Sequence, residues 1–413
     1  MTPRALLRAL FDRAVEVADP TRTLARHLPD KPAGRVVIIG AGKASARMAE
    51  AVEAEWGPCE GLVITRYGYA RRCAVEIVEA AHPVPDAIGL AATTRMLDLL
   101  RGLGPDDVVL ALMSGGASAL LVQPAGQITL AEKQAVNAAL LASGAPISAM
   151  NTLRKHLSLV KGGQLAAATP ARMLALLISD VPGDDPAMIG SGPTVGDRST
   201  VADARAVLDR WQIAVPASIV AVLAQPTGVI APGDPRLARV ENRIIAAPSQ
   251  SLHAAAELAR GQGCRVTLLG DALEGEAREV ASDQAQQAMA IRSAMRPGDP
   301  PHLLLSGGEL TVARRGKGIG GPNAEFALAL AIALQAASGI HALACDTDGV
   351  DGAAEVAGAV IGPDTLRRGP DAASALATND SHSFFAALND QVITGPTLTN
   401  VNDFRAILIT SEP

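Results

Sequence analysis

The sequence predicts an α/β protein with two domains. Short apolar runs rich in Val, Ile and Leu alternate with helical segments along the chain, which is typical of strands joined by helices. Several of these runs are apolar at every position, and this favours a parallel sheet that helices cover on both faces. A chain of 413 residues is also long enough to bury more than one hydrophobic core.

The first domain is expected to begin with an amphipathic helix. MTPRALLRALFDRAVEVAD, residues 1–19, mixes charged and apolar residues at helical spacing, whereas a signal peptide would need an uninterrupted apolar core. Helices are also expected over residues 44–55 and 87–103. The strands expected between the helices are VVIIG (36–40), GLVIT (61–65), VVLALM (108–113) and MLALLIS (173–179).

A domain boundary is expected in AQPTGVIAPGDPRLAR, residues 224–239, where three prolines interrupt the periodicity. We place the first domain at residues 1–232 and the second at 233–413. In the second domain, helices are expected from Ser249 onward and over 274–295. Its expected strands are RIIAAP (243–248), CRVTLLG (264–270), HLLLS (302–306) and HALACD (341–346).

One window of the second domain resembles a membrane span. Residues 326–345 contain no ionisable side chain apart from His341, if the terminal cysteine is set aside. However, Gln335, Ser338 and Gly339 interrupt the window, so a buried helix followed by a short strand fits it better than a span.

The composition narrows the class of protein. Apolar residues make up 48% of the chain and charged residues 19%, which is typical of a folded globular protein. Aromatic residues are scarce and the net charge is −6, so neither base stacking nor a basic surface favours a nucleic-acid partner. The four cysteines form no CxxC pair, which indicates structural thiols in a reducing compartment. We expect a cytoplasmic protein without membrane segments; a homodimer stays open.

Five expected strands lead directly into loops rich in Gly, Ser and Asp. In open α/β sheets, ligands bind beyond the carboxyl ends of the strands, where helix N-termini present free N–H groups. Because these loops come from both halves of the chain, they predict a binding cleft between two domains; for any single loop, glycines that only permit a tight turn are an equal alternative. The loops are GAGKAS (40–45), SGGASA (114–119), SDVPGDDPAMIGSGPT (179–194), SGGELT (306–311) and DTDGVDG (346–352).

The first loop presents Lys43 at a strand-to-helix turn. It is a poor dinucleotide site, because Ser45 stands at the third glycine position and the next strand ends in Thr65 and Arg66 instead of an acidic residue. It is also too compact for a P-loop. A lysine here can act as a point charge for phosphate; a solvated lysine at the start of a helix is the alternative.

The aspartate-rich loops have the chemistry of a magnesium–phosphate site. Asp180, Asp184 and Asp185 precede a Gly-Ser-Gly turn, which combines hard oxygen ligands with N–H donors. DTDGVDG repeats the carboxylates, including Asp348, but Ala357 stands where an EF-hand needs glutamate, so we exclude calcium. Asx-turns and helix caps are the structural alternative for some of these aspartates.

A basic segment, NTLRKHLSLVKGG at residues 151–163, lies between these loops. Arg154, Lys155, His156 and Lys161 could supply cations for a substrate carboxylate. For His156, a hydrogen-bonded structural role is the default.

Eight motifs in this order resemble the glycerate 2-kinases and span nearly the whole chain. The resemblance implies an N-terminal Rossmann-like α/β/α sandwich with a parallel sheet and a smaller C-terminal α/β domain, the MOFRL domain. It also implies ATP- and Mg²⁺-dependent phosphorylation of the C2 hydroxyl of D-glycerate, or a related hydroxy acid, to 2-phosphoglycerate; many members carry the older name hydroxypyruvate reductase. The motifs are GAGKAS, MSGGASALL, NTLRKHLSLVKGG, SDVPGDDPAMIGSGPT, SGGELTV, GGPNAEFAL, DTDGVDG and TGPTLTNVND.

The chain departs from the family pattern at a few positions. Members often read GGRNQEF where this chain reads GGPNAEF, so Pro322 replaces a proposed catalytic arginine. Arg315 or Lys317 then substitutes for it, or the role lies elsewhere. Ala324 and Leu398 are smaller departures, at positions where Gln and Gly are usual.

The candidate site residues fall into three groups. Lys43, Asp180 and Lys161 are the catalytic candidates, with Lys43 matching the lysine that the family uses in catalysis. Asp184, Asp185 and Asp348 are the metal candidates. The substrate- or phosphate-binding candidates are Ser114, Gly115, Gly116, Ser118, Arg154, Ser191, Gly192, Thr194, Ser306, Gly307, Gly308, Glu309, Lys317, Asn323, Glu325, Thr394 and Asn400.

Two other functions stay open on the sequence. One is an NAD(P)H-dependent hydroxypyruvate reductase, for which Arg66 would favour NADPH. The other is a non-catalytic sensor that binds a sugar acid or a nucleotide. The missing third glycine and acidic residue weaken the reductase, and the many charged loop residues weaken the sensor.

Overall fold

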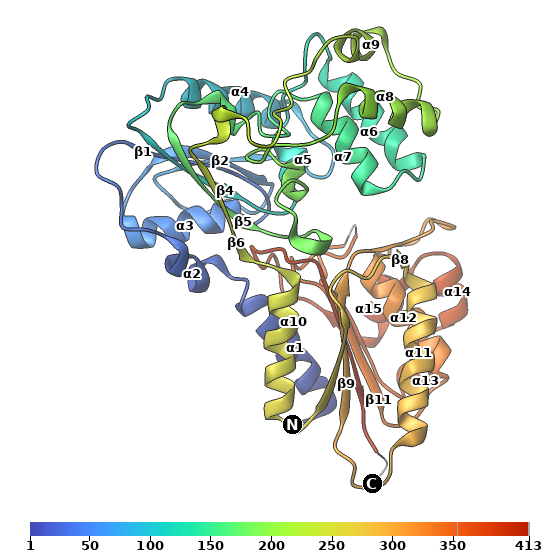
Figure 1. Cartoon of the computed structure of the whole chain (residues 1–413). Coiled ribbons are helices and arrows are strands. Elements are labelled where there is room, and N and C mark those ends of the chain that lie inside the picture. Colours follow the sequence, from blue (N-terminus) through green and yellow to red (C-terminus); the bar gives the residue numbers. More distant parts are fainter. Residues whose placement is uncertain (353, 412–413) are drawn as a thin grey trace. The chain divides into compact units, whose positions relative to one another are not determined.

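Two six-stranded sheets organise the chain, and each belongs to its own unit (Figure 1). The computed structural model describes residues 1–352 and 354–411. The parallel-sheet unit comprises Pro20–Ser179 and Asp184–Ile245. The mixed-sheet unit comprises Met1–Asp19, Asp180–Gly183 and Ala246–Pro413.

The first sheet has the strand order β3-β2-β1-β4-β5-β6. Strands β1 to β5 pair in parallel, and β1 is buried along its whole length, as its fully apolar sequence requires. The direction of strand addition reverses between β1 and β4, which makes this pair the switch point of the sheet. The strands are β1 (Val36–Ala41), β2 (Glu60–Arg66), β3 (Glu76–Ala80), β4 (Val108–Met113), β5 (Arg172–Ile178) and β6 (Val240–Ala246).

Helices cover both faces of this sheet. Helix α3 packs on β1, β2 and β4, and α4 packs on β2 and β3 from the opposite face (Figure 1). Helices α6 to α9 share a separate apolar cluster around Val136, Leu153 and Val207. The helices of the unit are α2 (Pro20–Thr23), α3 (Ser45–Trp56), α4 (Ala87–Arg101), α5 (Ala117–Leu120), α6 (Leu130–Ala142), α7 (Ile147–His156), α8 (Val201–Arg210) and α9 (Ala217–Leu223). Short 3₁₀ turns are η1 (Leu24–His27), η2 (Ala166–Ala168), η3 (Pro182–Asp184), η4 (Ile189–Ser191) and η5 (Pro235–Leu237).

The second sheet has the order β13-β12-β11-β14-β9-β7. Its pairs are antiparallel except for β7 and β9, and a two-stranded ladder of β8 and β10 accompanies it. The strands are β7 (Arg265–Gly270), β8 (Gly275–Glu276), β9 (His302–Gly308), β10 (Leu310–Thr311), β11 (Ile340–Asp346), β12 (Gly358–Ile361), β13 (Gln391–Val392) and β14 (Asp403–Ile409).

Alternating side chains of the second sheet enter two apolar layers. Phe404, Ala406 and Leu408 of β14 pack with α1 and α10, whereas Ile407 and Ile409 pack with α11 and α12. Alanines line α11 where it packs on α12, and α12 is buried nearly all round. The helices of the unit are α1 (Pro3–Glu16), α10 (Pro248–Gly261), α11 (Ala277–Ala294), α12 (Pro322–Leu334), α13 (Thr365–Arg368), α14 (Ala372–Ala377) and α15 (Ser381–Leu388).

A buried polar network ties β9, β14 and α12 together. Arg405, 1% exposed, donates to Asp403 Oδ2 at 2.9 Å and to the Gly307 carbonyl at 2.5 Å. Asp403 Oδ1 accepts from Asn323 Nδ2 at 2.7 Å. The backbone N–H groups of Asn323 and Ala324, at the start of α12, donate to Asp351. Because every charge in this network has a partner, it fixes the strand ends without leaving a buried charge exposed to an apolar interior.

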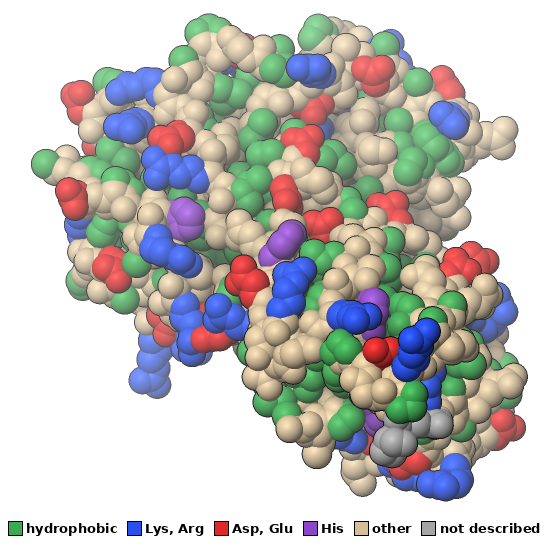
Figure 2. Space-filling view, turned by 60° about the horizontal axis from the view of Figure 1, so that its bottom comes forward, with side chains coloured by type: hydrophobic (Ala, Val, Ile, Leu, Met, Phe, Trp, Pro, Cys, Tyr) green, Lys and Arg blue, Asp and Glu red, His purple; other side chains and the backbone are tan. Residues whose placement is uncertain are grey.

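The structure confirms the predicted fold class and most of the predicted elements. The apolar window at 326–345 divides into α12 and β11, and in the described part of the chain no helix is long and apolar enough to cross a membrane. On the face shown in Figure 2, basic and acidic side chains are interspersed.

The division of the chain differs from the expected one. RIIAAP was expected to open the second domain, but β6 lies beside β5 at the edge of the first sheet, where Met173 N donates to Arg239 O. The units therefore change at Ile245 and Ala246, beyond the expected boundary at 232 and 233. The N-terminal helix α1 belongs to the mixed-sheet unit, because its apolar face packs on α10 and the second sheet.

We predict that Arg405→Met lowers the free energy of unfolding by about 3–5 kcal/mol, because it leaves Asp403 buried and without its cation. The double variant Asp403→Asn/Arg405→Met should regain most of this loss. Urea unfolding followed by circular dichroism measures both. Arg95→Met is the control, because Arg95 pairs with Glu76 on the surface and should cost less than about 1 kcal/mol; equal losses at the two arginines would contradict the role of the network.

Candidate functional site

The loops that follow β1 and β4 bond directly to each other at the switch point. Lys43 N donates to Gly115 O at 2.9 Å, and Ala44 N donates to Ser114 Oγ at 3.0 Å. Ser45 Oγ donates to Leu112 O at 2.8 Å. The start of α3 is thereby fixed by the end of β4, and GAGKAS and SGGASA form one structure, as their sequence positions predicted.

Gly42 makes this contact possible. Its φ is +136°, and a Cβ at this position would lie 2.1 Å from Ser114 Oγ. A side chain here would therefore push the two loops apart.

The side chain of Lys43 begins next to Gly116 and His82. A Cβ at Gly116 would lie 3.4 Å from Lys43 Cγ and 3.1 Å from the His82 ring, so the lysine stem, Gly116 and His82 are neighbours. Gly116 is the N-cap of α5. A cationic side chain thus starts from a rigid turn at the carboxyl edge of a parallel sheet, where α/β proteins bind anions.

The Gly-Ser-Gly turn of the third loop joins the same unit. Ser191 has the left-handed φ of +65°, and its Oγ lies 2.9 Å from Ser118 Oγ and 3.1 Å from Asn151 Oδ1. Lys161 Nζ donates to Ser118 O at 2.7 Å. The structure therefore brings together the candidates Ser118, Ser191 and Lys161, and adds Asn151, which sequence reasoning did not single out.

Two other groups of this turn have structural partners. Thr194 Oγ1 donates to Asn242 Oδ1 of β6 at 2.6 Å. A Cβ on Gly192 would lie 2.7 Å from Ala187 O, so close packing explains this glycine.

The basic segment separates into two faces of α7. Lys155 is buried against Asp197, and His156 bonds to Thr227 and Ser199, while burial lowers the pKa of its imidazole. These two residues have structural partners, as the default for His156 anticipated. Arg154 is half-buried and lies near two buried lysines, Lys161 and Lys133 of α6.

Sequence reasoning missed Lys133, although its signal was available. Lys133, Val136 and Leu140 lie at helical spacing on the buried face of α6, so a lysine occupies a core position. Burial and the neighbouring Arg154 lower the pKa of Lys133 to about 8.

The aspartates of the third loop are divided between the units. Asp184 has the left-handed φ of +54°, and its Oδ1 is buried without a hydrogen-bond partner among the described residues. An unsatisfied carboxylate oxygen is suited to a cation. Asp185 is exposed and its Oδ1 accepts from Ala187 N at 2.9 Å, an Asx-turn contact.

The remaining metal candidate, Asp348, lies in the mixed-sheet unit. It is buried, and its Oδ1 accepts from Val350 N at 2.8 Å. Within residues 1–352 and 354–411, no three His, Cys, Asp or Glu side chains gather to hold a metal ion. Magnesium usually takes only one or two carboxylates together with water and substrate phosphates, so the three metal assignments stay predictions.

Asp180 lies in the mixed-sheet unit with the last motif of the chain. Its Oδ2 accepts from Asn400 Nδ2 at 3.3 Å, and its carbonyl accepts from Asn402 Nδ2 at 3.2 Å. Two candidates separated by 220 positions therefore meet.

The second Ser-Gly-Gly does not resemble the first in its surroundings. Ser306, Gly307 and Gly308 lie inside β9 and pair with β14. Ser306 Oγ lies 3.2 Å from Gln284 Nε2 and 3.4 Å from Arg405 Nε. A Cβ on Gly308, whose φ is +104°, would lie 2.2 Å from Leu273 N. Close packing explains these glycines, and their role as donors to a ligand stays a prediction.

Other candidates of this unit are divided between interior and surface. Asn323 and Glu325 are fully buried, and Glu325 pairs with Arg278 at 2.7 Å. Pro322 occupies the first position of α12, where its fixed φ and missing N–H suit a helix start. The candidates outside the core are Glu309 and Lys317, both exposed, and Thr394, which bonds to its neighbour Gly395.

The comparisons with known proteins identify the family. Residues 6–224 match the domain of unknown function DUF4147, and residues 302–403 match the MOFRL family. A protein of Agrobacterium vitis with the provisional name hydroxypyruvate reductase is 52% identical, over 99% of this chain and 95% of its own. The D-glycerate 2-kinase of Thermotoga maritima is 38% identical, over 95% of each chain. The crystal structure of a glycerate kinase from Thermotoga maritima aligns with a TM-score of 0.85 at 36% identity, covering 98% of this chain and 99% of that one.

The chain belongs to the glycerate 2-kinase family. It is therefore an enzyme of the kinase class, as its eight ordered motifs indicated. The relatives of this chain carry two names, because some are named hydroxypyruvate reductase and others glycerate 2-kinase.

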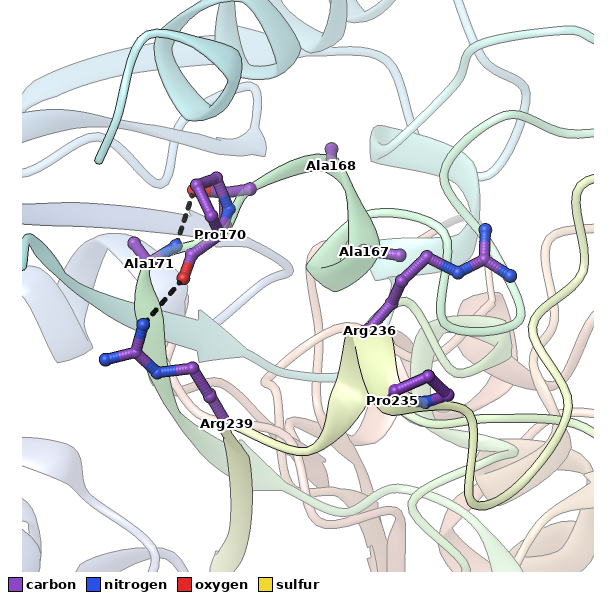
Figure 3. A pocket seen from close by; sticks show the side chains of 8 residues that line it. Ala167, Ala168, Pro170, Ala171, Pro235, Arg236 and Arg239 are labelled. Atoms are coloured by element: carbon purple, nitrogen blue, oxygen red, sulfur yellow. Dashed lines mark hydrogen bonds between the residues drawn. The ribbon is translucent and has the colours of Figure 1, made fainter. Parts of the chain in front are cut away.

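Figure 3 shows a surface pocket of the parallel-sheet unit between the segments of η2 and η5. It measures about 520 Å³ and is lined by residues 167–171 with Pro235, Arg236 and Arg239. Arg239 donates to Pro170 O at 3.2 Å. This pocket lies at the amino end of β5, whereas the loops of Lys43 and Ser114 follow the carboxyl ends of β1 and β4, so it is not the candidate site.

We predict that Gly42→Ala destabilises the parallel-sheet unit by about 2 kcal/mol or more, because the methyl group collides with Ser114. Gly68→Ala is the matched control: its φ is +84°, but no atom lies within 4 Å of the new Cβ, so only backbone strain of about 1 kcal/mol is expected. Thermal unfolding followed by tryptophan fluorescence reports this unit, because Trp56 and Trp211 both lie in it. Equal losses in the two variants would show that the contact with Ser114 contributes nothing.

Proposed function

We propose that this chain transfers the γ-phosphoryl group of ATP to the C2 hydroxyl of D-glycerate and forms 2-phosphoglycerate. The observation that carries the proposal is Lys43, whose backbone is bonded to the SGGASA loop at the switch point of the sheet. The Thermotoga maritima relative, named D-glycerate 2-kinase, supports the substrate and the position of transfer.

Lys43 would neutralise the charge of the transferring phosphoryl group. Phosphoryl transfer depends on positioning and electrostatic stabilisation more than on covalent chemistry. The bonds from Lys43 N and Ala44 N to the SGGASA loop fix the start of the lysine side chain. A preorganised cation of this kind stabilises charge that develops in the transition state.

Asp184 and Asp180 would take the other two tasks. The unsatisfied Oδ1 of Asp184 fits Mg²⁺, which, when bound, would offset the charge of the nucleotide phosphates. Asp180, oriented by Asn400, would accept the proton of the C2 hydroxyl.

A reductase is the second candidate, because relatives that share 52% of their residues with this chain carry that name. The geometry of the first turn weakens it. A dinucleotide needs free backbone N–H groups after β1 and an acidic residue at the end of β2. Here Lys43 N and Ala44 N are already bonded, and Thr65 at the end of β2 donates its hydroxyl to Gly42 O at 3.1 Å.

We predict ADP release when the purified protein is given D-glycerate, ATP and Mg²⁺, and no NADPH oxidation with hydroxypyruvate. Enolase added without a mutase should consume the product directly, because enolase acts on the 2-phosphate. NADPH oxidation without ADP release would replace the kinase by the reductase, and ADP release without an enolase signal would move the transfer from C2.

We predict that Lys43→Ala lowers kcat by about 10²-fold or more, by analogy with the loss of other preorganised donors. Steady-state kinetics with saturating ATP and D-glycerate measures it. Lys31→Ala is the control, because Lys31 is exposed and bonds to the carbonyls of Trp56 and Pro58. A Lys43→Ala enzyme with wild-type kcat would remove the catalytic role.

A further inference from the structure

Two buried lysines and a half-buried arginine of the parallel-sheet unit form a cluster without a carboxylate. Lys133 is 4% exposed and Lys161 is 1% exposed. Arg154 bonds to Asn137, one turn along α6 from Lys133, and burial, with the charge of Arg154 as a further cause, lowers the pKa of both lysines. In the described part of the chain, no Asp or Glu pairs with any of the three. The nearby Lys155, by contrast, is a buried lysine that has its own carboxylate, Asp197.

The members of this cation cluster differ in their contacts. Lys161 donates to the carbonyls of Ser118 and Leu121, at 2.7 and 3.3 Å. Arg154 donates from Nε to Asn137 Oδ1 at 3.2 Å and from Nη1 to Asn151 Oδ1 at 3.5 Å. Lys133 makes no hydrogen bond to a residue that the structure describes, and its Nζ is not among the fully enclosed polar atoms that lack a partner, so the amine keeps contact with solvent. The cluster therefore retains donors that an anion could use.

An unpaired buried cation destabilises a folded protein, because it loses its hydration and gains no opposite charge. Two further cations beside it add repulsion. Such an arrangement is typical of functional sites, in which a ligand supplies the missing charge. Val136 and Leu140 lie on the same buried face of α6 as Lys133. Both are apolar and cannot pair with a charged amine, so packing on this face does not explain the lysine.

A polar chain connects the cluster to the third loop. Asn151 Oδ1 accepts from Ser191 Oγ, and Ser191 Oγ lies 2.9 Å from Ser118 Oγ. Two hydroxyl groups and an amide thus lie beside the cations, a combination that suits a small molecule with both a carboxylate and hydroxyl groups. The planar guanidinium of Arg154 matches a carboxylate in shape.

We propose that Lys133, with Arg154 and Lys161, forms the subsite that binds the carboxylate of the hydroxy-acid substrate. The identity of the acid rests on the proposed function, whereas the need for an oxyanion rests on the cluster itself. A nucleotide phosphate offers the same oxyanion chemistry. A carboxylate is favoured, because the planar guanidinium of Arg154, which already lies beside the amide oxygens of Asn137 and Asn151, matches a carboxylate in shape.

The proposal has a pH signature of known sign. The pKa of Lys133 falls from its ordinary value to about 8, through burial and the charge of Arg154 on α7. The protonated amine binds the carboxylate, so affinity for the acid should fall as pH rises through about 8. In the ligand-free protein, the unfolded lysine binds more protons than the folded one above pH 8, so stability should rise with pH until the ordinary value is reached. As pH rises above about 8, the affinity for the acid should therefore fall while the stability of the ligand-free protein rises.

The test is Lys133→Met, measured by calorimetric titration without turnover. We expect a Kd for D-glycerate that is about 10- to 100-fold higher, an unchanged Kd for ADP, and a ligand-free Tm above that of the wild type. The pH dependence near 8 should disappear from both Kd and Tm. Lys155→Met is the matched control: it should lower Tm and leave the pH profile of binding unchanged.

Each other outcome contradicts one specific part. Unchanged affinity of Lys133→Met for D-glycerate, or a loss of affinity for ADP instead of D-glycerate, overturns the carboxylate subsite. A Tm of Lys133→Met below that of the wild type means that Lys133 is a structural lysine.

If the wild type binds hydroxypyruvate but not D-glycerate, the proposed function fails. The subsite is then supported if Lys133→Met loses hydroxypyruvate, and overturned if it does not. Glyceramide, which lacks the charge, should bind both proteins equally; a loss of glyceramide binding would point to damage of the site and overturn the charge argument.

Discussion

The parallel-sheet unit depends on the hydrogen bond from Ala44 N to Ser114 Oγ. Helix α3 has no side-chain cap of its own at Ala44, and the hydroxyl that caps it comes from the end of β4, 70 positions away. A helix cap normally stabilises a helix locally. Here the bond is tertiary, so the position of Lys43 depends on the register of β1 against β4 as well as on Gly42 within its own loop.

Both units contain buried ion pairs, including Lys155 with Asp197 in the parallel-sheet unit, but the parallel-sheet unit also contains, among its described residues, a cluster of cations without a carboxylate. In the mixed-sheet unit, Arg405, Arg278 and His382 each lie against a buried acidic residue, and these pairs join strands to helices. In the parallel-sheet unit, the cluster of Lys133, Arg154 and Lys161 has no such partner among the described residues. Paired charges of this kind join the elements of the fold, whereas an unpaired cluster costs stability until a ligand or the loss of a proton removes the excess charge.

Much of the fold could be predicted from the sequence, because buried parallel strands and helices carry a visible periodicity. Strand β14 was not predicted, because Arg405 within FRAILI resembles a solvent-facing residue until its partner Asp403 is known. The two Ser-Gly-Gly segments have the same letters, but only the first ends a strand before a helix. The sequence does not show which atoms lie next to each glycine. It therefore cannot distinguish a glycine that close packing requires from one that donates to a ligand. Lys133 was also missed, but here the sequence was sufficient, because its helical spacing with Val136 and Leu140 places a lysine on the buried face of α6.

The division of the chain has a consequence for how such proteins can arise and be dissected. The backbone passes between the units after Asp19, Ser179, Gly183 and Ile245. No single cut can therefore release either unit as one continuous fragment; a break near residue 232 would separate α1 from α10 and β6 from β5. Gene fusion or recombination could not exchange one unit for another in one step. Either unit can be made alone only if its separate segments are rejoined in a new order of connection.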